Sequence, residues 1–135
     1  MRYSAPFLLA LTVAGCSAGP PASCPTDFDA FLARYSEDAA FQREFTAPVV
    51  IQTRLENVEP EPRNVTEHKP ADTLVYPAFP GRAKREVLGL KRMKVSAEAR
   101  RAMVTIWKED TDYQISYRFE LDSCWRLVRV DDQSL

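Results

Sequence analysis

The sequence predicts an α+β domain, with amphipathic helices at its beginning packed on an antiparallel sheet that follows them. Two observations lead to this fold class. Aromatic residues between positions 28 and 45 recur at helical spacing, and the last third of the chain holds three β-rich runs joined by short turns. The chain has 135 residues and a formal net charge of −1, and its length suits one core of ordinary size.

The helices are expected within "PTDFDAFLARYSEDAAFQREFT", residues 25–46. Thr26, three residues before Asp29, makes a capping-box-like start. The residues that follow on one helical face are Phe28, Phe31, Leu32 and Tyr35. Ser36 can cap a second helix that carries Phe41 and Phe45 and ends near Pro48, because proline disfavours the helical conformation of the residue before it. We expect two helices, or one broken helix.

The middle of the chain is harder to interpret. "VVIQTRL", residues 49–55, is β-branched and predicts a strand. Residues 56–72 carry many charges and several prolines, which predicts a long exposed loop that is either functional or disordered. Between 74 and 103 the pattern is ambiguous: "RAKREVLGL" fits a short helix or a strand, and "SAEARRA" favours helix by propensity although strand-like residues follow it.

The last third predicts three strands, "MVTIWKE", "YQISYRFEL" and "WRLVRVD". In the middle run, apolar side chains alternate strictly with polar ones from Tyr113 to Leu121, which is the period of a half-buried strand. The connections at 110–112 and 122–124 are short, so we expect an antiparallel meander.

The first residues resemble a lipoprotein signal peptide. Met1 and Arg2 supply a positive start, and the apolar run from Phe7 to Val13 falls short of the roughly 20 residues that a membrane span needs. Val13-Ala14-Gly15-Cys16 then resembles the bacterial lipobox. The resemblance implies cleavage of the signal peptide, residues 1–15, and a lipid anchor on Cys16. The alternative is an ordinary cleaved signal peptide in which Cys16 is incidental.

The same resemblance implies the cellular location of the domain. Ser17 rather than Asp follows the cysteine, which implies the outer membrane, with the domain on its periplasmic face. Residues 16–25 include the small, Pro-rich and uncharged stretch "SAGPPAS", and we expect them to form a lipidated flexible tether. Residues 26–135 are expected to form the single α+β domain.

Lipidation of Cys16 leaves Cys24 and Cys124. Because the envelope is oxidising, we expect these two to form a disulfide, the alternative being two separate thiols. No metal site is expected, because the sequence has no closely spaced pair of Cys or His.

The two ends of the domain carry a further resemblance. "FDAFLARYSEDAAFQREF" together with "YRFELDSCWRLVRVDDQSL" resembles the nuclear transport factor two-like superfamily, and within it a family of uncharacterised bacterial lipoproteins. The resemblance implies a cone-like fold in which a curved sheet wraps around the first helices to form a cup. Some members of the superfamily are isomerases or dehydratases that use an Asp base, or an Asp–His pair, beside tyrosines in an apolar pocket.

The aromatic residues offer one candidate pocket and the basic residues one candidate interaction surface. The pocket candidates are Trp107, Tyr113, Tyr117 and Trp125, for which the alternative is simply the core. The partner patch candidates are Lys84, Arg85, Lys91, Arg92 and Lys94, in a segment, 82–101, with eight basic and two acidic residues. The alternative for this patch is that acidic residues of the first helices neutralise it.

No catalytic residue, cofactor or nucleic-acid partner is predicted. The only histidine, His68, falls in the predicted loop, and no nucleophile stands beside a base. We therefore expect a non-enzymatic, membrane-anchored binding or interaction module that engages an envelope protein or a small ligand. The alternative is a small pocket enzyme of the isomerase or dehydratase type.

Overall fold

The computed structural model describes Gly15 and residues 23–135, except for the side chain of Arg92. Its helices are α1 (Phe28–Tyr35), α2 (Ala39–Glu44), the single 3-10 turn η1 (Ala71–Thr73) and α3 (Arg82–Leu88). Its strands are β1 (Thr46–Glu56), β2 (Arg63–Pro70), β3 (Arg92–Ala97), β4 (Arg101–Trp107), β5 (Gln114–Leu121) and β6 (Trp125–Asp132). The predicted signal peptide, the predicted lipidation of Cys16 and most of the predicted tether lie outside the described residues.

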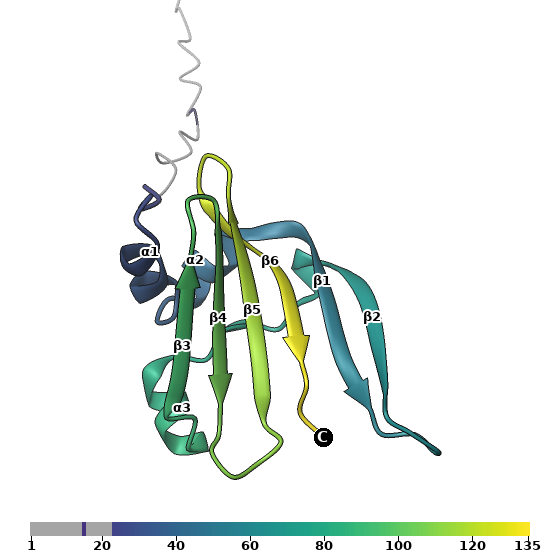
Figure 1. Cartoon of the computed structure of the whole chain (residues 1–135). Coiled ribbons are helices and arrows are strands. Elements are labelled where there is room, and N and C mark those ends of the chain that lie inside the picture. Colours follow the sequence, from purple (N-terminus) through teal and green to yellow (C-terminus); the bar gives the residue numbers. More distant parts are fainter. Residues whose placement is uncertain (1–14, 16–22) are drawn as a thin grey trace, which may run out of the picture.

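The strands form one curved sheet in the order β2-β1-β6-β5-β4-β3 (Figure 1). The three strands predicted near the end of the chain are confirmed as β4, β5 and β6, and they form the expected antiparallel meander. The sheet as a whole is mixed, however, because β1 pairs with β6 in parallel. The prediction of a wholly antiparallel sheet is therefore wrong: β1 follows the helices directly and runs in the same direction as β6.

The helices begin one or two residues later than the capping patterns predict. Asp27, not Thr26, caps α1, with its Oδ1 accepting from the N–H of Ala30 at 2.8 Å. Asp38, not Ser36, caps α2, with its Oδ1 accepting from the N–H of Phe41 at 3.0 Å. A carboxylate at these positions satisfies a free N–H and also favours the positive end of the helix.

Two segments of the middle take structures that the sequence did not predict. Within the expected loop at 56–72, residues Arg63–Pro70 form strand β2, which pairs antiparallel with β1. An edge strand needs few apolar residues, so its polar composition misleads. "SAEARRA" spans the end of β3, the turn at 98–100 and the start of β4, and the N–H of Glu98 bonds to the carbonyl of Arg101 at 2.7 Å.

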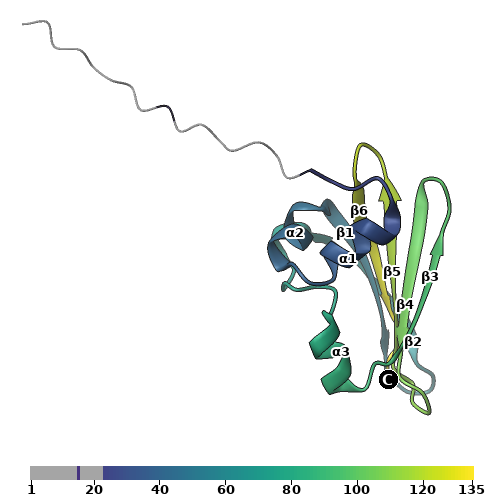
Figure 2. The same ribbon diagram turned by 90° about the vertical axis from the view of Figure 1, so that its left-hand side faces the viewer.

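Helices α1 and α2 lie on the concave side of the sheet (Figure 2), and their aromatic side chains form part of the core there. Phe28 lies between the sheet residues Phe119 and Trp125, with ring centroids 5.4 and 4.9 Å away. Phe31 and Tyr35 are fully buried beside Phe119, in a core that also takes Phe41 and Phe45 of the second predicted helix. Burying one such ring contributes about 1.5 to 3 kcal/mol.

The buried side-chain amide of Gln42 binds the segment around Phe79 to this core. Gln42 donates from Nε2 to the carbonyl of Phe79 at 2.9 Å and accepts at Oε1 from the N–H of Phe79, also at 2.9 Å. Gln42 and Phe79 are both fully buried, so each polar group finds its partner without water. The pair holds the chain that leads into α3.

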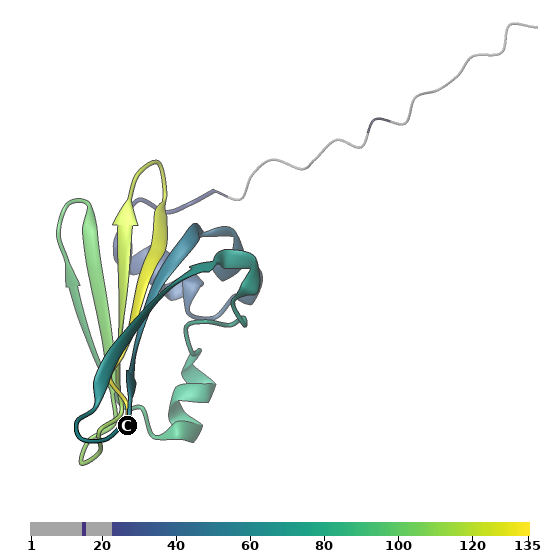
Figure 3. The ribbon, with the colours of Figure 1, turned by 90° about the vertical axis from the view of Figure 1, so that its right-hand side faces the viewer.

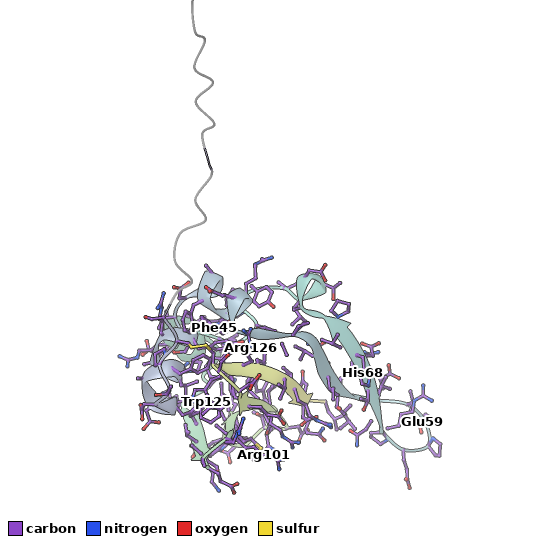
Figure 4. The ribbon with its side chains drawn as sticks, turned by 90° about the horizontal axis from the view of Figure 1, so that it is seen from above. Phe45, Glu59, His68, Arg101, Trp125 and Arg126 are labelled. Carbon is purple, nitrogen blue, oxygen red and sulfur yellow. A yellow bond between two sulfur atoms is a disulfide. The ribbon has the colours of Figure 1, made fainter. Side chains whose placement is uncertain are left out.

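A disulfide links the start of the domain to its last hairpin. Cys24 and Cys124 are bonded, with Cα atoms 5.7 Å apart, which confirms the predicted bridge. Two residues further on, the carbonyl of Thr26 accepts from the indole N–H of Trp125 at 2.8 Å. Both links tie the start of the domain to the β5–β6 hairpin, and Figure 4 shows the yellow disulfide beside Trp125 and Phe45.

Candidate functional site

The upper part of the concave face is filled by side chains. Two of the predicted pocket residues, Tyr117 and Trp125, are 3% and 2% exposed and belong to the core. The buried polar residues in the described part of the chain are Ser36, Gln42, Thr46 and Thr53, all of them uncharged. Burial raises the pKa of Tyr35 and of Tyr117 above the ordinary value, so both hydroxyls stay neutral.

The other two predicted pocket residues lie elsewhere. Trp107 ends β4, in which Ala102, Val104 and Ile106 face the core, so the alternation of the strand puts the Trp107 ring on the convex face. There it lines a shallow hollow of about 350 Å³ with Lys94 and Gln114. The structure therefore does not bring the four predicted aromatics into one pocket.

One carboxylate, that of Asp132, lies near Tyr113 and Tyr117. Tyr113 stands just before β5 and Asp132 ends β6, where Asp132 pairs with Ile115. Burial raises the pKa of Tyr113, and the charge of Asp132 raises it further. Asp132 also accepts at Oδ1 from the N–H of Ser134 at 2.9 Å. Tyr113, Tyr117 and Asp132 thus form a partly buried group at the lower end of the concave face.

A groove of about 520 Å³ lies between α1, α3 and β3. We call it the β3 groove. Its floor is apolar and consists of Leu32 of α1, Phe79, and Met93 and Val95 of β3. Met93 and Val95 are 44% and 38% exposed, although they pair with the buried Ile106 and Val104 and share the concave face with them.

The walls of the β3 groove carry opposite charges. On the α1 side stand Asp29 and Glu37, and on the α3 side stand Arg82 and Arg85. Glu37 accepts at Oε1 from the backbone N–H of Arg82 at 2.9 Å, and Arg85 donates from Nη1 to the carbonyl of Pro80 at 2.8 Å. These bonds fix the two walls in position while leaving most of the Arg85 N–H groups for other acceptors.

The predicted basic patch is spread over two sides of the molecule. Lys84 and Arg85 lie on α3, Lys91 follows it, and Lys94 lies on β3 with its side chain in the convex hollow beside Trp107. Arg85 and Lys91 line a small hollow of their own. Glu37, which follows α1, accepts from the backbone N–H of Arg82 at the start of α3.

His68 and the charged residues around it belong to the opposite edge of the sheet. His68 lies exposed on β2, far from Trp125 and Phe45 (Figure 4). On β1 and β2, Arg54 pairs with Glu56 at 2.7 Å and with Glu67 at 2.9 Å, and Lys69 pairs with Glu67 at 3.4 Å. Within residues 23–135 no group of three potential metal ligands is present, and no helix there is long and apolar enough to span a membrane.

The sequence did not point to the β3 groove. Its floor combines residues that are far apart in the chain, Leu32, Phe79 and Met93. Two of them lie between 74 and 103, where the sequence pattern is ambiguous. The one available indication is that "RMKVSA" alternates basic or polar residues with apolar ones, as a strand with one buried face does.

Comparison with known proteins supports the fold. Neither a protein-family model nor a curated protein sequence matches the chain. A solved structure of an NTF2-like protein from Bacteroides fragilis is similar, with a TM-score of 0.58 and 14% sequence identity. The match covers 81% of this chain and 47% of the other, so this chain spans about half the length of that protein. The predicted nuclear transport factor two-like α+β fold is thereby supported, and at this identity the likeness concerns the fold alone.

Proposed function

We propose that the protein is a non-enzymatic binding module that engages its partner in the β3 groove. The observation that carries the proposal is the contrast between two surfaces. The upper concave face, where a pocket enzyme would place its acid, is filled by rings such as Phe31, Phe119 and Trp125. The groove beside it is open, apolar at its floor and charged at its walls.

The second part of the proposal concerns location. The lipobox-like Val13 to Cys16 supports a lipid anchor at the outer membrane. The described chain enters beside α1, at the end of the sheet opposite α3 (Figure 1). A tether at that end would leave α3 and the lower part of the groove directed away from the anchor. Loss of fatty-acid labelling and of membrane association in Cys16→Ser tests this part, and unchanged labelling would contradict it.

Site-specific photo-crosslinking tests the groove. Ala33 is exposed on α1 and lines the groove, so a photoreactive amino acid placed there should form an adduct with the partner in cells. The matched control is the same amino acid at His68, which is exposed on the opposite edge strand. Adducts from position 33 alone are expected. Equal adducts from both positions, or none from either, would contradict the proposal.

A second candidate function rests on Tyr113, Tyr117 and Asp132. A carboxylate beside two tyrosines in partly apolar surroundings could remove a proton next to a carbonyl, as an isomerase does. This candidate expects the chain to convert a β,γ-unsaturated ketone into its conjugated isomer and Asp132→Asn to abolish the reaction. Asp110→Asn, in the exposed turn after β4, is the matched control. Conversion at the uncatalysed rate eliminates this candidate.

A further inference from the structure

The two edge strands of the sheet differ in how they are protected. β2 carries the paired charges Glu67 and Lys69 and ends at Pro70, features that discourage another strand from adding to it. β3 pairs with β4 over six consecutive residues, Arg92 to Ala97, with no shift of register. It has no proline, and its side chains on the concave face are apolar. β3 is therefore the less protected edge.

The free backbone hydrogen-bonding groups of β3 lie along its open edge. Glu98 bonds to Arg101, so the alternation of an antiparallel ladder gives the next bonded pairs to Ser96 and Lys94. The N–H and C=O groups of Met93 and Val95 consequently face the open edge. Their side chains form part of the floor of the β3 groove. One strand thus offers both backbone partners and an apolar surface to the same ligand.

The charges around β3 indicate the composition of that ligand. A strand added beside β3 sits about 4.8 Å away, with alternate side chains on the concave and convex faces. Those on the concave face would meet Met93 and Val95, and those on the convex face would meet Lys94. Lys94 carries a positive charge on the convex face of β3, so acidic side chains are the complementary ones on that face.

We infer that β3 binds an extended segment of a partner protein by strand addition, and that this segment alternates apolar and acidic residues. The inference rests on the proposed function and specifies its partner. Apolar side chains of the segment occupy the floor of the β3 groove, while an acidic side chain on the convex face pairs with Lys94. The backbone bonds supply affinity, and the alternation supplies specificity.

A synthetic peptide tests this inference. We use acetyl-Val-Glu-Val-Glu-Val-Glu-amide, with the block sequence Val-Val-Val-Glu-Glu-Glu as the control of equal composition. Amide hydrogen exchange of the full chain is followed by NMR. We expect the Met93 and Val95 amides to exchange fast in the free chain and to slow about tenfold or more at saturation with the alternating peptide. The block peptide should have little effect, and the Lys94 and Ser96 amides, already bonded to β4, should change least.

Two variants separate strand addition from other binding. Val95→Pro removes an N–H that faces the open edge while the ladder to β4 keeps its bonds, so it should abolish the protection; Val95→Thr keeps the N–H and should preserve it. Lys94→Glu should raise the Kd several-fold, most strongly at low salt, whereas Lys69→Glu on β2 should not. Peptide binding without protection of Met93 and Val95 would overturn the inference. Concentration-dependent protection in the free chain would overturn it too, because the occupant would then be a second copy.

The outcome also distinguishes failure of the inference from failure of the proposed function. If crosslinking from position 33 captures a partner while Val95→Pro leaves that capture unchanged, strand addition is wrong and groove binding holds. If position 33 yields no adduct and the peptide does not bind, both are wrong.

Discussion

At the scale of single residues, the buried side-chain amide of Gln42 makes the clearest prediction about stability. It is the partner of both backbone polar groups of Phe79, and no water reaches the pair. Gln42→Ala leaves a buried donor and a buried acceptor unsatisfied, at about 1 to 3 kcal/mol each, so we expect a loss of roughly 2 to 6 kcal/mol of unfolding free energy. Denaturant unfolding measures this. Gln114→Ala, on an exposed position of β5, is the control and should change stability by less than about 0.5 kcal/mol.

The buried tyrosines make a second prediction at this scale. Burial raises the pKa of Tyr117 in the folded chain, while the unfolded chain has the ordinary value near 10. The neutral hydroxyl therefore stabilises the fold fully below about pH 10, and this contribution falls as pH rises from there toward the folded pKa. Unfolding free energy measured from pH 8 to 11.5 should decline less steeply in Tyr117→Phe than in the wild type. Equal slopes would mean that Tyr117 ionises without unfolding.

At the scale of elements, the β1–β2 hairpin is held at its surface by ion pairs. Hydrogen bonds from Arg54 and then from Lys69 lower the pKa of Glu67, and bonds from Arg54 and Arg63 lower that of Glu56. Arg54→Gln should raise both values toward about 4.3. NMR titration of the two carboxyls measures this, with Arg43→Gln on α2 as the control.

The lowered pKa values of Glu56 and Glu67 also predict how acid affects the stability of the hairpin. Because the folded pKa values are lowered, the pairs contribute fully above about pH 4.5 and lose their contribution as pH falls through the folded values. The residues are exposed, so the effect on stability is small and weakens with salt. We therefore expect Arg54→Gln to leave the midpoint of acid unfolding nearly unchanged. Unchanged pKa values of Glu56 and Glu67 in this variant would contradict the account of the ion pairs.

The elements also differ in how far the sequence could predict them. β5 was predicted because Tyr117 and Phe119 alternate with solvent-facing residues, and one face of that strand lies on the core. β2 was missed because it lies at an edge, where Glu67 and Lys69 pair with neighbours instead of packing in the core. The candidate pocket was only partly informative, because alternation along a strand puts Trp107 and Tyr117 on opposite faces once the register is known. The β3 groove depends on where α1 and α3 lie relative to β3, which the local sequence pattern does not contain.

At the scale of the whole molecule, strands β1 and β2 bend over toward α2 while β3 and β4 stand apart from them (Figure 3). The Cys24–Cys124 bond joins the first residues of this arrangement to the last hairpin, across 100 residues of sequence. Closing a loop of this length in the unfolded chain corresponds to about 4.7 kcal/mol in the chain-entropy model. We expect the double substitution Cys24→Ser and Cys124→Ser to lower the unfolding free energy by about 2 to 5 kcal/mol. Stability equal to that of the wild type would show that the bridge constrains nothing.

The most direct test of the binding-module proposal compares the groove with the lower concave face. The partner captured from position 33 is titrated against the wild type, Met93→Glu and Asp132→Asn. Met93→Glu places a charge on the apolar floor of the groove and should weaken binding about tenfold or more, since each factor of ten is about 1.4 kcal/mol. Asp132→Asn should leave the Kd unchanged. If Asp132→Asn weakens binding and Met93→Glu does not, the site is the Tyr113, Tyr117 and Asp132 group, and the groove proposal is wrong.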